Sequence, residues 1–226
     1  MIEKKSFNVE RILALVKKDK KRQEELSLAL HSIKHHMDHC WYHYQEFKAA
    51  IKFHDYAMHN ELPAGTEIQN PQYYRCAFEA NCFAFFSGLH ALIDNLPFVL
   101  YVLDGDLNFK DKAFWGKAKL SLKGIGSETL SERLDTFTNQ ETFLELKELV
   151  NTIKHRRLPR IDSANDSADR DASFVNSDLD FKLSETSILK LMEKFHVEIV
   201  EKLLIEFIYD LGEYLTSSQI QKAQIK

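Results

Sequence analysis

The chain has 226 residues, of which 44% are hydrophobic, so it can build a sizeable core and is not expected to be disordered throughout. Its formal net charge of −4 argues against a general nucleic-acid coat protein, although it leaves room for a local basic patch. Because only 7 Gly and 4 Pro occur, the sequence leaves room for long uninterrupted helices.

The cysteines, the N-terminus and the most hydrophobic segment bear on the cellular compartment. Cys40, Cys76 and Cys82 are an odd set inside apolar helical patterns, which is typical of reduced core thiols in a cytosolic protein. The N-terminus lacks the apolar run of a signal peptide. Residues 73–103 are long and apolar but carry charged and polar side chains, which favours a buried helix over a membrane span. We therefore expect a cytoplasmic protein without a membrane segment.

The first half of the chain predicts two long helices. A short helix is expected within an N-terminal extension at 1–22. A long helix follows over about 23–59, where apolar residues recur at alternating steps of four and three. Asn70 as N-cap and Pro71 at the first helical position then open a second, central helix. Pro97 is expected to kink or end that helix.

A long connection and a third helix come next. Within residues 104–137, the segments 113–122 and 128–137 are each expected to form a short helix. Thr138 and Glu141 fit a capping box, in which the threonine would be the N-cap of the third main helix.

A second long connection, residues 158–183, is polar and acidic, and it predicts either a small β-hairpin or a mobile loop. Ser184 is then expected to cap a fourth long helix over about 185–215. The whole chain, 1–226, is therefore predicted to be one all-α domain: an antiparallel four-helix bundle with ancillary short helices, and a small β-hairpin after the third main helix as an optional feature.

The end of the third helix holds the most informative residues. Asn151 and His155 stand four residues apart, so both point to one side of the helix. The histidine is surrounded by the basic residues Lys154, Arg156, Arg157 and Arg160. A titratable imidazole beside an amide and a basic cluster suits phosphodiester chemistry or simple phosphate contact.

Residues 144–160 resemble the signature helix of the HEPN superfamily, the higher eukaryotes and prokaryotes nucleotide-binding domains. Those proteins are helical bundles, and many are metal-independent ribonucleases whose motif is Arg, a polar residue, a few more residues and then His. The polar residue matches Asn151 and the histidine matches His155, but the arginine position is Val150. The resemblance implies RNA cleavage or RNA binding in a defence or toxin–antitoxin system, without a cofactor or metal.

Three interpretations of this helix end remain open. In the first, His155 takes the proton from an RNA 2′-hydroxyl or gives a proton to the leaving oxygen. Lys154, Arg156 or Arg75 then replaces the motif arginine in stabilising the charge of the transition state. In the second, the same residues bind a phosphate or nucleotide without cleaving it. In the third, His155 packs at an interface, while Arg156 and Arg157 favour the helix C-terminus.

Two further groups of histidines could bind a metal. The first long helix carries histidines spaced by four, at His31, His35, His39 and His43. Because this stripe drifts by about 40° at each step, a solvated or subunit-contact face is favoured over a metal site. His90 and Asp94 could join His155 as metal ligands, but a hydrogen bond between the two is the favoured interpretation. No metal is therefore predicted.

Partners follow from the helix surfaces. We expect a homodimer, because HEPN signature residues lie in a cleft near a dimer interface and two-fold dimers are the commonest oligomers. RNA, an antitoxin or another protein are the candidate partners. The alternative function is a non-catalytic dimeric helical interaction module.

Overall fold

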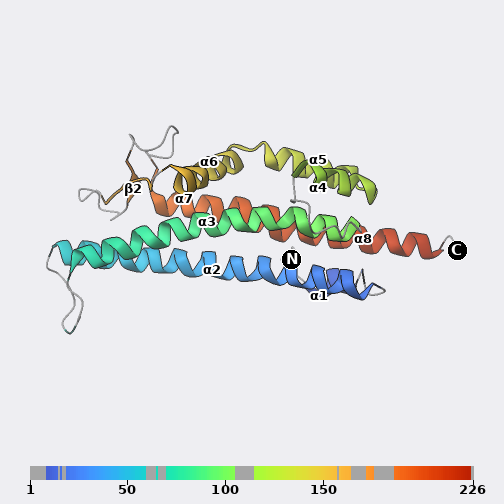
Figure 1. Cartoon of the computed structure of the whole chain (residues 1–226), viewed down its shortest axis with the longest axis horizontal. Coiled ribbons are helices and arrows are strands. Elements are labelled where there is room, and N and C mark those ends of the chain that lie inside the picture. The colour runs from blue at the N-terminus through green and yellow to red at the C-terminus, as the bar shows by residue number, and fades with distance from the viewer. Residues whose placement is uncertain are drawn as a thin grey trace, which may run out of the picture. The chain divides into compact units, whose positions relative to one another are not determined.

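The structure is a computed structural model, and it describes residues 9–14, 16, 19–59, 65, 70–104, 115–156, 158–163, 172–175 and 186–224 (Figure 1). Helices take up 86% of the described residues, beside one short two-stranded sheet, which confirms the all-α prediction. The chain divides into two compact units. The first unit contains residues 1–36, 91–143 and 197–226, and the second unit contains residues 37–90 and 144–196.

The first three helices are α1 (Val9–Ala14), α2 (Lys20–Met58) and α3 (Pro71–Asp104). The start of α3 forms as predicted, because the side chain of Asn70 accepts a hydrogen bond of 2.9 Å from the backbone N–H of Gln72. Most of the predicted apolar positions of α2 are buried, namely Leu26, Leu30, Ile33, Cys40, Tyr44, Phe47 and Ile51. Met37, which was also predicted, is only partly buried.

Pro97 lies inside α3 and does not end it. Of the two predicted alternatives, a helix end at this residue is wrong, whereas a kink stays a prediction. Beyond the proline, Val99, Leu100 and Val102 are buried. Burial of these side chains offsets the hydrogen bond that proline cannot make, so packing overrides the local propensity.

Among the described residues, the segment Pro71–Leu103 is the one helix long and apolar enough to cross a membrane by length and composition, with a mean hydropathy of 1.4 in its most apolar window. Half of that window is buried inside the fold. An apolar core helix meets the same criterion, so the cytoplasmic location stays a prediction.

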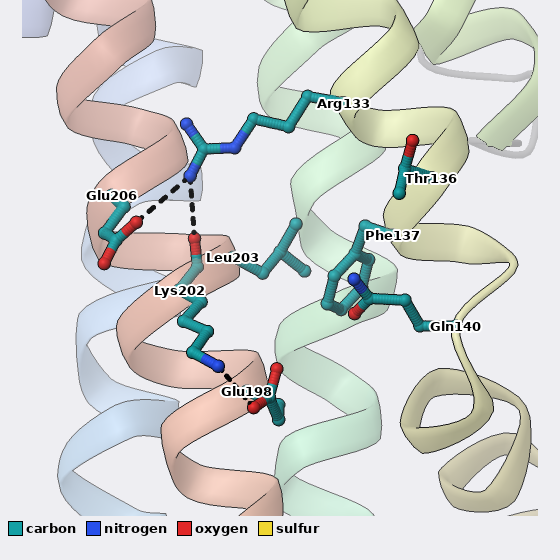
Figure 2. Close-up of a pocket in the computed structure, with 8 residues that line it drawn as sticks. All are labelled: Arg133, Thr136, Phe137, Gln140, Glu198, Lys202, Leu203 and Glu206. Carbon is teal, nitrogen blue, oxygen red and sulfur yellow. Dashed lines mark hydrogen bonds and ion pairs between the residues drawn. The ribbon is translucent and has the colours of Figure 1, made fainter.

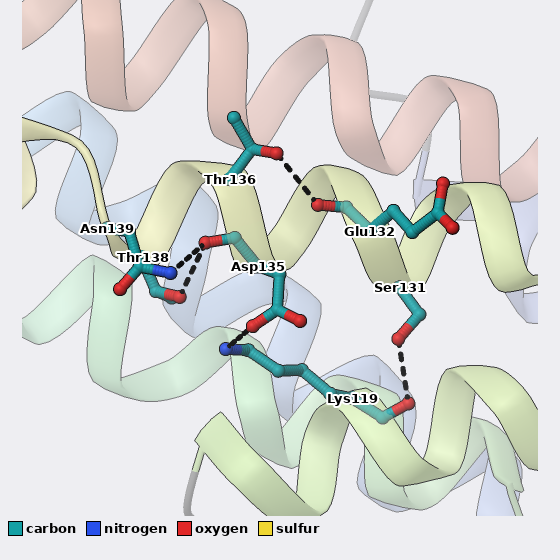
Figure 3. Close-up of polar contacts among 7 residues, drawn as sticks. All are labelled: Lys119, Ser131, Glu132, Asp135, Thr136, Thr138 and Asn139. Atoms are coloured by element: carbon teal, nitrogen blue, oxygen red, sulfur yellow. Dashed lines mark hydrogen bonds and ion pairs between the residues drawn. The ribbon is translucent and has the colours of Figure 1, made fainter.

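In the first unit, α4 (Trp115–Gly124) packs on α5 (Glu128–Thr138), close to the two short helices that were predicted. Ser127 is the N-cap of α5 and accepts from the backbone N–H of Leu130. Two polar contacts join the helices: Lys119 pairs with Asp135, and the Ser131 hydroxyl donates to the Lys119 carbonyl at 3.3 Å (Figure 3).

The predicted capping box at Thr138 does not form. Thr138 is the last residue of α5, and its hydroxyl donates to the carbonyl of Asp135 at 3.1 Å, as the side-chain amide of Asn139 also does at 2.9 Å (Figure 3). Helix α6 begins three residues later and runs over Glu141–His155. The prediction failed because threonine and asparagine side chains bond backward to a helix carbonyl as readily as forward to a helix N–H.

The second unit contains the two-stranded sheet. Strands β1 (Ile161–Asp162) and β2 (Ser173–Phe174) pair antiparallel, with Ile161 opposite Phe174. The small antiparallel pair that was one of the two alternatives after the third main helix is therefore present. The ring of Phe86 on α3 lies 6.2 Å from that of Phe174, which packs the sheet against the long helix.

The predicted fourth helix is divided into α7 (Ile188–Phe195), the π-helix η3 (His196–Glu206) and α8 (Phe207–Gln224). Ser187 is the N-cap of α7, whereas Ser184 lies outside the described residues. The π-helix was not predicted, because apolar residues at steps of four fit an α-helix equally well.

Candidate functional site

Helix α6 presents one buried side and one solvent-facing side. At 100° per residue, Leu144, Asn151 and His155 fall within about 40° of one another around the helix. Leu144 is 51% exposed, Asn151 is partly buried, and His155, the last residue of α6, is exposed. The structure therefore confirms that Asn151 and His155 share a side that is not the core side.

Basic side chains lie at the C-terminal end of α6. Lys154 and Arg156 are both exposed, and we call the group Lys154, His155, Arg156 and Arg160 the basic end of α6. Arg157, which the sequence also proposed as a binding residue, lies outside the described residues. Cations at a helix C-terminus also interact favourably with the helix dipole, so this cluster stabilises α6 as well as offering positive charge to solvent.

One carboxylate on this side was missed from the sequence. Glu148 lies at helical spacing between Leu144 and Asn151, and its Oε1 is 3.5 Å from the Nη1 of Arg156. The two side chains are 45% and 61% exposed, so their ion pair contributes at most about 1 kcal/mol. A phosphate can therefore displace Glu148 from Arg156 at small cost. Its position four residues after Leu144 and three before Asn151 is the sequence signal that could have found this carboxylate.

Position 150, where the HEPN motif has arginine, belongs to the core. Val150 is 0% exposed, as are Leu146 and Leu149 on the same helix. A guanidinium at this position would be buried, so the exposed side of α6 receives no arginine from within its own helix. Charge for a phosphate has to come from the basic end of α6 or from another element.

Arg75 is half-buried and held by two contacts. Its Nε lies 3.0 Å from Oε1 of Glu79, and its Nη2 donates to the carbonyl of Ile161 at 3.1 Å. The guanidinium therefore joins α3 to β1, six residues beyond His155. This arrangement anchors the segment that follows the basic end, and the suggested substrate contact of Arg75 remains a prediction.

The backbone after α6 is also held in place. The N–H of Arg156 closes the last helical turn on the carbonyl of Thr152 at 3.0 Å, and Pro159 is buried. The N–H of Val175, after β2, donates to the carbonyl of Arg160 at 3.0 Å. The basic end is thus positioned by main-chain bonds and packing on both sides of His155, so less ordering is needed when a ligand binds.

A second polar group in the second unit was also missed. His54 is buried on α2, with its ring 5.3 Å from that of Phe78 in an edge-to-face arrangement. Burial lowers the pKa of His54 below its ordinary value of 6.5, and the charge of Arg75 lowers it further. Asp55 and Glu79 act in the opposite direction with smaller effect. The imidazole is therefore kept neutral, which fits a packing role better than acid–base chemistry.

The histidines along α2 do not converge. His31 is exposed and its Nδ1 lies 2.8 Å from the carbonyl of Ser27 on its own helix, whereas His43 is partly buried with its Nδ1 2.8 Å from Oδ1 of Asn81. His35 and His39 are exposed. Within the described ranges, no group of three His, Cys, Asp or Glu side chains is arranged to hold a metal ion.

His90 and Asp94 differ in exposure. Asp94 is exposed at the surface and His90 is partly buried. The two residues are therefore not a fully buried pair, and the hydrogen bond between them stays a prediction.

The first unit contains a pocket of about 280 Å³ between α5 and η3 (Figure 2). Its lining residues are Arg133, Thr136, Phe137, Gln140, Glu198, Lys202, Leu203 and Glu206. The four charged ones pair with one another: Arg133 lies 3.3 Å from Glu206, and Lys202 lies 2.5 Å from Glu198 (Figure 2). Because these charges neutralise each other, the pocket offers little to a charged ligand.

Comparison of the chain with protein-family models, with curated proteins and with solved structures found no match.

Proposed function

We propose that the chain is an RNA-binding protein with a divergent HEPN-like signature helix, which contacts RNA phosphates through the basic end of α6. As part of this proposal, the main helices form an antiparallel four-helix bundle, and the protein acts as a homodimer in the cytoplasm. A defence or toxin–antitoxin system, with an antitoxin as protein partner, is the setting that the resemblance implies.

The observation that carries the proposal is the exposure of Lys154, His155 and Arg156 at an anchored helix end. Phosphate contacts supply most of the affinity of non-specific nucleic-acid binding, and they need accessible cations. The weak Glu148–Arg156 pair is compatible with binding, since a phosphate oxygen can replace the carboxylate.

Binding without cleavage is the favoured form of this function. His155 could still transfer a proton, but general acid–base catalysis of phosphodiester cleavage also needs charge stabilisation in the transition state. The motif position that would supply it is the buried Val150, and a flexible lysine does not reproduce the fork of a guanidinium. If cleavage does occur, it should need no metal and should depend on His155.

The alternative is a non-catalytic interaction module. It is favoured by Leu144 and Leu158, two large apolar side chains that are more than half exposed on α6 and just after it. In that case the same surface would contact a second copy of the chain or a protein partner, and the basic residues would form its rim.

RNA binding in low salt, with chelator present, tests the proposal. The variant Lys154→Gln/Arg156→Gln should bind a labelled single-stranded RNA about tenfold more weakly than wild type, an effect of about 1.4 kcal/mol. The matched control is Lys123→Gln/Lys202→Gln, which removes two exposed lysines of the first unit and should leave affinity within about twofold.

Two further variants, His155→Ala and Leu144→Glu, distinguish catalysis, binding without cleavage and the interaction module. RNA turnover that falls by about two to four decades in His155→Ala would support catalysis. Binding without turnover supports the favoured form. If wild type neither binds nor cleaves RNA, and light scattering shows a dimer that Leu144→Glu dissociates, the RNA proposal is wrong and the interaction module stands.

A further inference from the structure

The solvent-facing side of α2 in the second unit combines an exposed tryptophan with lysines. Trp41 is 54% exposed, and Lys48 and Lys52 are both exposed. At 100° per residue these three positions fall within about 40° of one another, so they form one stripe along the helix. We call Trp41, Lys48 and Lys52 the α2 stripe.

The rings around Trp41 hold it in place. Its ring centroid lies 5.5 Å from that of Tyr44 and 6.1 Å from that of His196. Tyr44 is itself fixed, because its hydroxyl donates to Glu193 on α7 at 2.5 Å. Trp41 thus has packed neighbours on its inner side while more than half of its surface faces solvent.

The lysines of the α2 stripe lie against neutral rings. The Nζ of Lys48 is 5.2 Å from the centroid of Tyr44, and the Nζ of Lys52 is 5.6 Å from that of Tyr56. In the part of the chain that the structure describes, no carboxylate forms an ion pair with either lysine. A cation–π contact orients an ammonium group without cancelling its charge, so both remain able to attract an anion.

We propose that the α2 stripe is a stacking site for single-stranded RNA, in which a base stacks on Trp41 while Lys48 and Lys52 contact the neighbouring phosphates. This inference rests on the proposed function and adds to it. An aromatic platform beside a row of cations is the combination by which proteins bind single strands. Residues 144–160 contain no Phe, Tyr or Trp, so Trp41 would add a larger stacking surface than the His155 imidazole of the basic end of α6.

The spacing of the stripe agrees with an extended strand. Lys48 lies about 10 Å along the helix axis from Trp41, and Lys52 lies about 6 Å beyond Lys48, at 1.5 Å per residue. A strand running along α2 would therefore place one base on the indole and the following phosphates beside the two amines. Duplex RNA would not bind in this way, because its bases are already stacked on one another.

Tryptophan fluorescence tests the proposal directly. The chain has 2 Trp, and Trp115→Phe leaves Trp41 as the only one. Single-stranded oligouridylate of about 12 nucleotides should quench this emission, whereas the same length of duplex RNA should not. Trp41→Ala should weaken single-strand affinity about tenfold to a hundredfold, and Trp41→Phe should retain part of it.

The matched control is Tyr42→Ala. Tyr42 is 56% exposed but lies about 100° around the helix from Trp41, so its removal should leave single-strand affinity unchanged. Lys48→Gln/Lys52→Gln should weaken binding and reduce its salt dependence, by about 0.7 in the log–log slope for each lost phosphate contact.

Three results would overturn the inference, and they separate it from the proposed function. If Lys154→Gln/Arg156→Gln weakens binding but Trp41→Ala behaves like Tyr42→Ala, the stacking site is wrong while the basic end of α6 stands. If wild type binds no RNA, both proposals are wrong. If Trp41→Ala instead converts a dimer to a monomer in light scattering without altering RNA binding, the α2 stripe is a contact between copies of the chain.

Discussion

The basic end of α6 and the pocket between α5 and η3 use similar side chains in opposite ways. In the pocket, each charged lining residue pairs with another, and Arg133 additionally bonds to the carbonyl of Lys202 (Figure 2). Arg133 also pairs with Asp210, which lies outside the pocket lining. At the basic end, Lys154 and Arg156 are exposed, and the ion pair of Arg156 with Glu148 joins two exposed side chains.

From this difference, we expect charge pairing to separate structural cations from the cations that we propose for binding. The guanidinium of Arg133 holds α5 against η3 and α8, so its removal should affect stability. The cations of α6 can exchange a weak partner for a phosphate, so their removal should affect binding.

The largest effect on stability should come from placing an arginine on the buried side of α6 rather than on its exposed side. Val150→Arg places a guanidinium at a fully buried position, and it should lower the free energy of unfolding by about 3–5 kcal/mol without creating ribonuclease activity. Leu144→Arg, on the exposed side of the same helix, should change it by less than about 0.5 kcal/mol. Urea unfolding measures both; equal stability of the two variants would contradict the burial of position 150.

Removal of the pocket's central cation should destabilise the protein more mildly. Arg133→Met leaves Glu206 and Asp210 without their shared partner, and it should cost about 1 kcal/mol in the free energy of unfolding, since the groups are partly exposed. RNA affinity should stay unchanged. A stable variant that had lost RNA binding would instead place the interface in the first unit.

Removal of the carboxylate from the exposed side of α6 should increase binding. Glu148→Gln removes the ion pair with Arg156 and a negative charge beside the proposed phosphate contact, so RNA affinity should rise about threefold to fivefold at low salt. Glu198→Gln, which frees Lys202 in the first unit, is the control and should have no such effect. Weaker binding by Glu148→Gln would show that the carboxylate positions Arg156 rather than competing for it.

The smallest effect concerns pH. The folded-state pKa of His54 is lowered by burial, so the unfolded chain binds the proton more tightly, and stability falls as the pH drops below about 6.5. His54→Phe keeps a ring against Phe78 and removes the titration. Between pH 5 and 7, thermal unfolding of His54→Phe should therefore depend less on pH than that of wild type; identical profiles would show that the imidazole is not held neutral.

Most of the helical architecture could be predicted because long apolar stripes need partners. The positions that bury α2 and α3 follow from the spacing of their apolar residues, and the start of α3 follows from Asn70 and Pro71. The failures were local. Pro97 is tolerated because the residues beyond it are buried, and Thr138 bonds backward to Asp135. Both depend on tertiary contacts or on a choice between two equivalent hydrogen bonds.

The candidate site could be predicted only in part for a similar reason. Helical spacing placed Asn151 and His155 on one side of α6, and that placement is confirmed. Spacing is compatible with the Arg75–Glu79 pair, which lies four residues apart on one helix, but it could not say that Arg75 also bonds to the β1 backbone, because Ile161 is far away in sequence. The α2 stripe was not predicted, because exposed aromatic and basic residues at helical spacing also occur on an ordinary solvated helix face.

The salt dependence of RNA binding tests the central claim most directly. If Lys154 and Arg156 contact phosphates, the slope of log affinity against log salt concentration for a single strand should be shallower in Lys154→Gln/Arg156→Gln than in wild type by about 1.4, or 0.7 for each contact. Lys123→Gln/Lys202→Gln should leave the slope unchanged. Equal slopes for wild type and Lys154→Gln/Arg156→Gln would contradict the claim that the basic end of α6 binds RNA.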